Sequence, residues 1–230
     1  GAGNATMSGS DNIGIGSTTL NGNTTGNNNL GLGVSVLSIN TIGNNNVSTE
    51  YAGIMSGSGS LVKIGAGTLA ILGTNIHTGG TIVSNGMLGG VGVLTGLVSV
   101  ASGGALSPGT NGVGMLTVGS VTLNSGATFA IQLGGTNAAD YSRLAVSSGS
   151  ISLGDSVLSL SLTNGFMAKT GNSFTVIRND PNNPVTGKFA CGSRLRMLGI
   201  PGSFLVNYAG GAGNDVVLQY WADGTVMVIQ

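Results

Sequence analysis

Short runs of alternating apolar and polar residues, each bounded by Gly or Asn, make up much of the chain. Residues 68–72, 81–83 and 116–118 are examples, and no run is long enough to show a helical period. Alternation with a period of two is typical of a β-strand, and Gly and Asn mark the turns between strands. The pattern therefore predicts an all-β protein made of many short strands.

These runs recur at a nearly constant interval. Residues 12–16 (Asn-Ile-Gly-Ile-Gly) and 29–33 (Asn-Leu-Gly-Leu-Gly) are 17 residues apart. A looser repeat, Gly followed by one or two small or apolar residues and then Leu or Phe, begins at Gly67, Gly86, Gly104 and Gly126. Units of about 17–22 residues are too short for a helical pair but fit one coil of a parallel β-helix, or β-solenoid.

A stack of coils would explain the positions of the main residue types. Ile, Leu and Val would fill the interior, Gly and Asn would form corners that need a positive φ, and Ser, Thr and Asn would form hydrogen-bonded ladders outside. Like charges on successive coils would repel one another. The composition fits, because 44 of 230 residues are Gly, 40% are apolar and only 6% are charged.

Composition and charge exclude several classes of protein. The formal net charge of zero provides no basic surface for nucleic acid. No apolar run approaches the roughly 18 residues of a transmembrane helix, and the single cysteine, Cys191, cannot form an intrachain disulfide. Gly1 in place of Met, without a signal peptide, predicts a processed chain or a fragment.

Residues 65–88 carry a denser motif, G-A-G-T-L-A-I-L-G-T-N-I-H-T-G-G-T-I-V-S-N-G-M-L. It resembles the autotransporter-associated β-strand repeat of bacterial autotransporter passengers, roughly G-x-G-T-L-x-L-x-G-x-N-x-Y-x-G-x-T followed by a short strand and G-x-L. His77 takes the place of the usual Tyr. Similar passenger-like segments lie at 100–109, 140–146, 174–177, 185–189, Tyr208 and 213–218.

The resemblance covers about residues 58–220 and implies a right-handed parallel β-helix that is displayed on, or released from, a bacterial outer surface. We expect Asn/Gly-rich solenoid repeats at 1–57, an autotransporter-associated repeat β-helix at 58–139 and a C-terminal β region that closes the solenoid at 140–230. Charge supports a boundary near 140, because only Asp11, Glu50 and Lys63 of the fourteen charged residues precede it.

Residues 210–218 fit the calcium-binding nonapeptide G-G-x-G-x-D-x-U-x. In that interpretation Asp215 and loop carbonyls would hold the ion. Such sites form between consecutive nonapeptides, and this chain has one copy. The alternative is a glycine turn that leads into a final strand at 216–220.

Catalytic chemistry has little support in the sequence. Polysaccharide-cleaving β-helices need two or three carboxylates on one face, whereas the seven acids are scattered and Asp140 and Asp155 lie less than one expected coil apart. His77, the only histidine, has no acid nearby in sequence, and we expect it on the outer surface, stacked or solvated. We predict no enzyme, no catalytic residue, no cofactor and no metal.

Two further features are candidates for specific contacts. Arg194 and Arg196 lie close to Cys191, whose thiol pKa they could lower, and the default interpretation is a passive cysteine. The loop 180–184, Asp-Pro-Asn-Asn-Pro, should protrude between strands near 174–178 and 185–189, with an ordinary hairpin connection as the alternative.

The sequence therefore predicts a non-catalytic, extracellular structural or adhesive β-solenoid of a bacterial surface protein. A second hypothesis is a self-assembling subunit of an extracellular filament or sheath, because an uncapped coil leaves an edge that another copy can extend. The apolar residues 226–229 could then add a strand to a neighbour. A polysaccharide-degrading β-helix is a third, weaker alternative.

Overall fold

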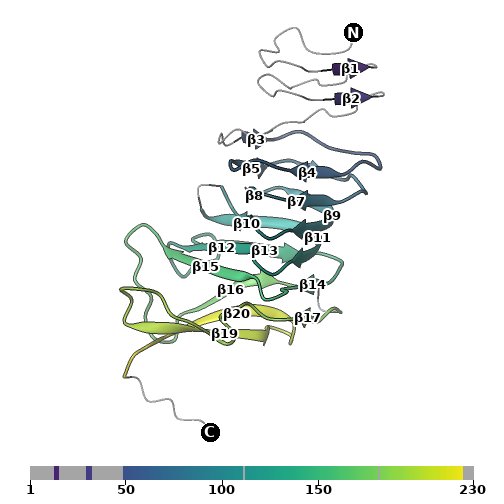
Figure 1. The fold of residues 1–230 in the computed structure, drawn as a ribbon. Coiled ribbons are helices and arrows are strands. Elements are labelled where there is room, and N and C mark those ends of the chain that lie inside the picture. Colours follow the sequence, from purple (N-terminus) through teal and green to yellow (C-terminus); the bar gives the residue numbers. More distant parts are fainter. Residues whose placement is uncertain (1–12, 16–29, 33–48, 111, 181, 225–230) are drawn as a thin grey trace.

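A computed structural model describes residues 13–15, 30–32, 49–110, 112–180 and 182–224, and every regular element among them is a β-strand (Figure 1). The strands form one sheet of two strands, one of six and one of twelve. The prediction of an all-β protein is confirmed. Within the described residues, no helix is long and apolar enough to cross a membrane.

The two-stranded sheet joins the first pair of repeats. Strand β1 (Ile13–Ile15) pairs in parallel with β2 (Leu30–Leu32), and Ile13 lies opposite Leu30. The 17-residue interval of the sequence is therefore the interval of the strand register. The rest of the region 1–48 lies outside the described residues.

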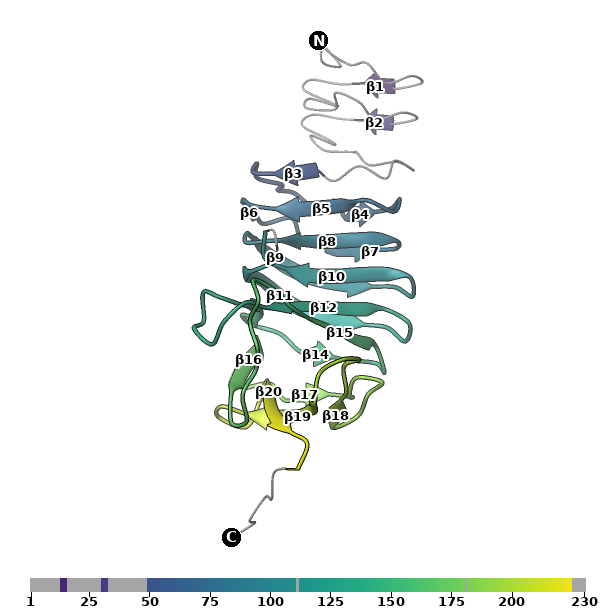
Figure 2. The same cartoon turned by 90° about the vertical axis from the view of Figure 1, so that its left-hand side faces the viewer.

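The six-stranded sheet is parallel throughout (Figure 2). In spatial order its strands are β3 (Thr49–Tyr51), β5 (Thr68–Ile71), β8 (Gly86–Gly90), β10 (Gly104–Pro108), β12 (Thr128–Leu133) and β15 (Val157–Leu162). The register stacks Leu69, Leu88, Leu106, Phe129 and Leu158 in one buried column. The first four members of this column are the Leu and Phe positions of the loose glycine repeat in the sequence.

The twelve-stranded sheet is mixed. Its parallel part contains β4 (Leu61–Lys63), β7 (Thr81–Val83), β9 (Val93–Val100), β11 (Gly114–Leu123), β13 (Ser142–Val146) and β16 (Ser173–Arg178), with β6 (Thr74–Asn75), β14 (Ile151–Ser152) and β17 (Val185–Thr186) beside it. Its antiparallel part adds β20 (Asp215–Ala222), β19 (Gly202–Gly210) and β18 (Arg194–Leu195) to β16. We call β16, β20, β19 and β18 the cap.

The cap departs from parallel pairing because a short turn joins β19 to β20. The turn at 211–214 is too short to carry the chain back to the start of β19, so the two strands that it joins pair antiparallel. A parallel neighbour would have required a crossover of a dozen or more residues. The described C-terminal region thus ends the parallel stack with a hairpin instead of a further parallel strand.

The interior lies between the two large sheets and contains further columns of stacked residues. Val83, Val100 and Leu123 follow one another in register and are fully buried. Toward the cap, aromatic rings replace these aliphatic columns. Phe174 packs against Tyr141 at a centroid distance of 5.4 Å and against Phe204 at 6.3 Å.

Close stacking explains the need for glycine at Gly90. Its φ is +111°, and a Cβ atom there would lie 1.9 Å from the carbonyl oxygen of Ile71 on the neighbouring strand. Any side chain at this position would force β5 and β8 apart.

Candidate functional site

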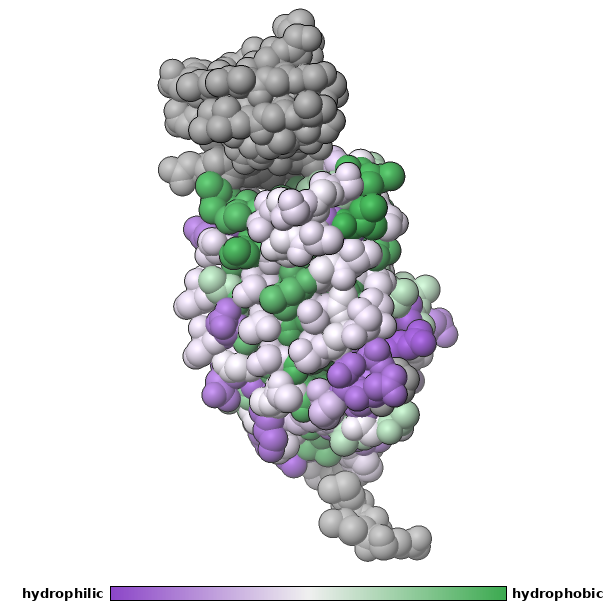
Figure 3. Space-filling model, turned by 90° about the vertical axis from the view of Figure 1, so that its right-hand side faces the viewer, coloured by the Kyte–Doolittle hydropathy of each residue, from purple (hydrophilic) through white to green (hydrophobic). Residues whose placement is uncertain are grey.

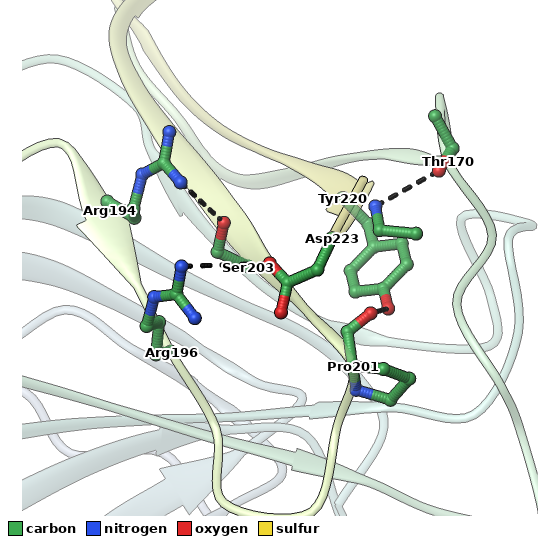
Figure 4. Close-up of polar contacts among 8 residues, drawn as sticks. Thr170, Arg194, Arg196, Pro201, Ser203, Tyr220 and Asp223 are labelled. Carbon is green, nitrogen blue, oxygen red and sulfur yellow. Dashed lines mark hydrogen bonds and ion pairs between the residues drawn. The ribbon is translucent and has the colours of Figure 1, made fainter. Parts of the chain in front are cut away.

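Polar side chains gather on the cap (Figure 4). The Arg194 guanidinium donates a hydrogen bond from Nη1 to the Ser203 hydroxyl at 3.2 Å. Arg196 Nη2 lies 3.6 Å from Asp223 Oδ1, and the two side chains are 64% and 56% exposed. Solvent screens such an exposed pair, which limits its contribution to at most about 1 kcal/mol.

Two contacts fix the backbone around these side chains. The Tyr220 hydroxyl donates to the Pro201 carbonyl at 2.6 Å, and the Ala222 N–H donates to the Thr170 hydroxyl at 3.0 Å. The first joins the start of β19 to β20, and the second joins the end of β20 to the segment between β15 and β16. The arginines therefore project from a backbone that is held at several points.

The cluster has a clear chemical preference. It presents two guanidinium groups and one carboxylate, and the hydrogen-bond partner of Arg194 is a neutral hydroxyl. Guanidinium groups recognise carboxylate and phosphate groups through paired hydrogen bonds. The Arg194–Arg196 contact surface predicted from the sequence is thus suited to an anionic group.

The two loops that stood out in the sequence lie against each other. The Asn179 N–H donates to Asp215 Oδ1 at 2.9 Å, and the Asn214 side-chain amide donates to the Asp180 carbonyl at 2.5 Å. The hairpin alternative for 180–184 is wrong, because β17 pairs in parallel with β14 and not with β16. Parallel pairing positions β17 one strand further along the stack than β14.

Asp215 begins β20 directly after the glycine turn at 211–214, as the alternative interpretation predicted. Its Oδ1 accepts one backbone hydrogen bond, and Asn179 beside it is 5% exposed with an unpaired Oδ1. No group of three or more His, Cys, Asp or Glu side chains that could hold a metal occurs among the described residues. Calcium binding at Asp215, which we weighed against the glycine turn and did not predict, is not tested by the structure.

The expectation of an outward, solvated His77 is wrong. The ring is 4% exposed, and Nε2 lies 3.1 Å from both the Gly80 carbonyl oxygen and the Thr81 hydroxyl. Nδ1 is buried without a hydrogen-bond partner in the described structure. His77 thus ties together the turn that precedes β7, which is a structural role.

Cys191 is half-buried beside the cap. Burial raises the pKa of its thiol. The causes of this pKa shift do not include Arg194 or Arg196, and its direction agrees with the passive cysteine that was the default interpretation of the sequence. The nearby Tyr208 hydroxyl donates to the Gly192 carbonyl at 2.5 Å, and burial raises the pKa of this phenol as well.

Asp140 and Asp155 occupy two different turns. Asp140 follows β12 and accepts a hydrogen bond at Oδ2 from the side-chain amide of Asn137 at 2.8 Å. Asp155 has a φ of +55° in the turn before β15, and its N–H donates to the Lys188 carbonyl at 3.0 Å. Both residues have local roles in turns.

Sequence analysis missed the burial of Lys63. This side chain is 2% exposed, and its ammonium group donates to the carbonyls of Ile64 at 2.8 Å, Gly65 at 2.7 Å and Asn85 at 3.2 Å. Desolvation lowers its pKa. The place of Lys63 in the repeat could have indicated its burial, because Lys63 lies in register with Val83 in an inward-facing column.

The opposite end of the described structure exposes apolar side chains. Figure 3 shows green patches next to the grey residues at this end. Exposed apolar residues within β4 and β7 or close to β3, β4 and β6 include Ile54, Val62, Ile64, Ile76 and Ile82. No protein-family model matches the chain, and no curated protein matches it.

Proposed function

We propose that this protein is a non-catalytic, extracellular structural or adhesive β-solenoid of a bacterial surface protein. In this proposal the stacked strands form a right-handed parallel β-helix with coils of about 17–22 residues in its regular part. The resemblance of residues 58–220 to autotransporter passengers supports both the fold and the location at the outer cell surface.

One observation carries the proposal. Five buried residues, Leu69, Leu88, Leu106, Phe129 and Leu158, stack in one column across parallel strands. Each fully buried side chain of this size contributes about 1.5–3 kcal/mol of hydrophobic stabilisation. A column of this kind produces an elongated, self-supporting body whose length grows with each repeat, which suits display at a distance from a surface.

The mechanism would be geometric. The stacked backbone ladders keep the body stiff and resistant to proteases, and the side chains that project from it make the contacts. The Arg194–Arg196 surface on the cap and the exposed apolar residues of the first described coils are the two surfaces that offer chemistry for adhesion.

A second candidate function is self-assembly into an extracellular filament or sheath. The observation that favours it is the position of β15 at the end of the six-stranded sheet, with no further strand beyond it among the described residues. An open strand edge is a template for pairing with another chain.

Surface display tests the first proposal. The chain would be fused ahead of a bacterial surface-translocation unit, and intact cells would be treated with a broad-specificity protease. We expect a folded, protease-resistant core that includes residues 49–224 and is accessible to antibodies. A Gly90→Val variant, in which β5 and β8 cannot stack, is the matched control and should be degraded. Rapid degradation of the unaltered chain on intact cells would contradict the proposal.

A further inference from the structure

Strand β15 ends the six-stranded sheet with an open backbone edge. In a parallel ladder, alternate residues direct their backbone groups to opposite neighbours. The Val157 N–H donates to the Ala127 carbonyl at 2.8 Å, and the Thr163 N–H donates to the Leu133 carbonyl at 2.9 Å. The backbone groups of Leu158, Leu160 and Leu162 consequently face away from β12, and no described residue forms a hydrogen bond with them.

The two large sheets end differently. The twelve-stranded sheet ends in β18, which has only two residues and carries the charged Arg194. A short, charged edge strand discourages further pairing. Strand β15 has six residues, Val-Leu-Ser-Leu-Ser-Leu, with no charge, no proline and no bulge in its register with β12. The described structure thus protects one sheet edge and leaves the other open.

Among the described residues, a backbone hydrogen bond reaches this open edge only at its beginning. The Ala190 N–H donates to the Ser156 carbonyl at 2.8 Å, so the segment after β17 runs along the first residues of the edge. Further along, Leu160 and Leu162 are only partly buried although they pack against the core, and Ser159 and Ser161 are exposed. An added strand would cover Leu160 and Leu162 and pair with their backbone groups.

The chain contains one segment that matches this edge in length and character. Residues 225–230, Thr-Val-Met-Val-Ile-Gln, lie outside the described residues and follow β20 after only Asp223 and Gly224. They are uncharged and rich in β-branched residues, which favour strands. Their length equals that of β15.

We propose that the open edge of β15 binds residues 225–230 of a second copy of this chain as an added strand. A second copy is favoured because both ribbon views show the described chain ending beyond β19 and β20, while β15 lies on the other side of these strands (Figures 1 and 2). The end of β20 is held there by the contact of Ala222 with Thr170. This inference relies on the second proposed function only for self-association, and the display function does not depend on it.

The experiment uses the chain with and without residues 225–230, together with a fluorescent peptide of the same six residues. We expect the full chain to associate in sedimentation velocity and the shortened chain to remain monomeric. The peptide should bind the shortened chain, as measured by fluorescence anisotropy. The strands β3 to β20 pair with one another through described residues, and circular dichroism would verify that the shortened chain keeps its fold.

Lysines on the edge provide the sharper test. Ser159→Lys with Ser161→Lys puts two charges on exposed positions of β15 and should weaken peptide binding by about tenfold or more. Thr95→Lys is the control, because Thr95 is exposed on β9, which pairs with β6 and β7 on one side and with β11 on the other, and the change removes only its hydroxyl hydrogen bond to the Asn75 carbonyl. This variant should bind the peptide as well as the unaltered chain.

Three results would overturn the proposal. The first is equal association of the full and shortened chains, which would leave self-assembly in place but assign it to another surface. The second is a shortened chain that does not bind the peptide, or binds it equally well with both lysines on β15. The third is a full chain that stays monomeric and does not bind the peptide. In that case residues 225–230 would pair with β15 of the same chain. In none of these cases is surface display affected.

Discussion

The parallel stack and the cap hold their strands together by different means. In the stack, the same role recurs on successive parallel strands, so that Leu88 and Leu106 occupy equivalent places in the same column. In the cap, each residue has its own partner, such as Phe174 among three other aromatic rings. The charged residues Arg194, Arg196 and Asp223 are on the cap as well.

This difference follows from the geometry of stacking. A residue in the stack has a copy of its own environment one strand above and one below, which penalises charge and favours uniform apolar side chains. The cap has a single copy of each element and no such constraint. It can therefore carry charges, large aromatics and loops, and these are the features from which a specific contact is built. Substitutions in the stack and in the cap should therefore have different consequences.

The largest effect is expected at Gly90. Replacing it with Val puts a side chain where a Cβ atom would already lie 1.9 Å from the Ile71 carbonyl oxygen, at a φ of +111°. We expect a loss of about 4–5 kcal/mol or more in the free energy of unfolding, measured by denaturant titration.

Gly57→Ala is the matched control for this variant. Gly57 also has a positive φ, +93°, but no atom lies within 4 Å of its Cβ position, so the cost should be only about 1–2 kcal/mol. Equal losses in the two variants would show that backbone conformation, and not close stacking, makes Gly90 necessary.

The next effect concerns the independence of the cap. Phe174→Ala removes a fully buried ring from the aromatic cluster and should cost about 3–5 kcal/mol. We expect amide hydrogen exchange to accelerate in β19 and β20 before it changes in β8 and β10. Leu106→Ala, in the stack, should reverse this order. Uniform acceleration in both variants would show that the stack and the cap unfold as one unit.

A smaller effect is expected from Lys63 at the beginning of the stack. Desolvation lowers the pKa of Lys63 in the folded chain, so the unfolded state binds more protons between that value and the ordinary value of 10.5. Stability contributed through this group should therefore rise with pH across that window. Lys63→Met should lack this rise, which parallel denaturant titrations at several pH values would detect. An identical pH slope in both proteins would show that Lys63 is not desolvated.

The reaction rate of the Cys191 thiol reports on its environment beside the cap. Because burial raises the pKa of the thiol, we expect slower reaction with a thiol reagent at neutral pH than in the unfolded chain, with a rate that increases as the pH rises. Faster reaction in the folded chain would show that Arg194 and Arg196 do activate the thiol.

The smallest effect is expected at the exposed ion pair. Arg196→Ala should change the free energy of unfolding by less than about 1 kcal/mol, because both partners are mostly exposed. A larger loss would mean that the pair helps to hold the cap in place, contrary to the role in recognition that we assign to this surface.

The sequence predicted the stack well because repetition is a local signal. The interval between Gly-x-Leu motifs is the interval of the strand register, so that Leu69, Leu88 and Leu106 could be identified as inward-facing before any coordinates. The alternation of apolar and polar residues also predicted correctly that the regular elements of the described residues are β-strands.

The cap and the burial of Lys63 and His77 could not be predicted in the same way. Whether β19 and β20 pair antiparallel depends on the length of one turn and on what lies beside β16, which no periodicity records. The burial of Lys63 depends on three backbone carbonyls that converge from the turns after β4 and after β7, and the burial of His77 depends on the turn before β7. Residue type alone favours exposure for both.

The central claim is that successive strands stack in register. Val62, Ile82, Ser99, Thr122 and Ser152 form one column across β4, β7, β9, β11 and β14. Spin labels at positions 62 and 152, with Cys191 replaced by Ser, would measure the separation of its ends by pulsed electron paramagnetic resonance. Four strand spacings place the two backbones about 19–20 Å apart. A narrow distance distribution near that value is expected, allowing for the label side chains, whereas a mean distance beyond about 35 Å would contradict the stacked arrangement.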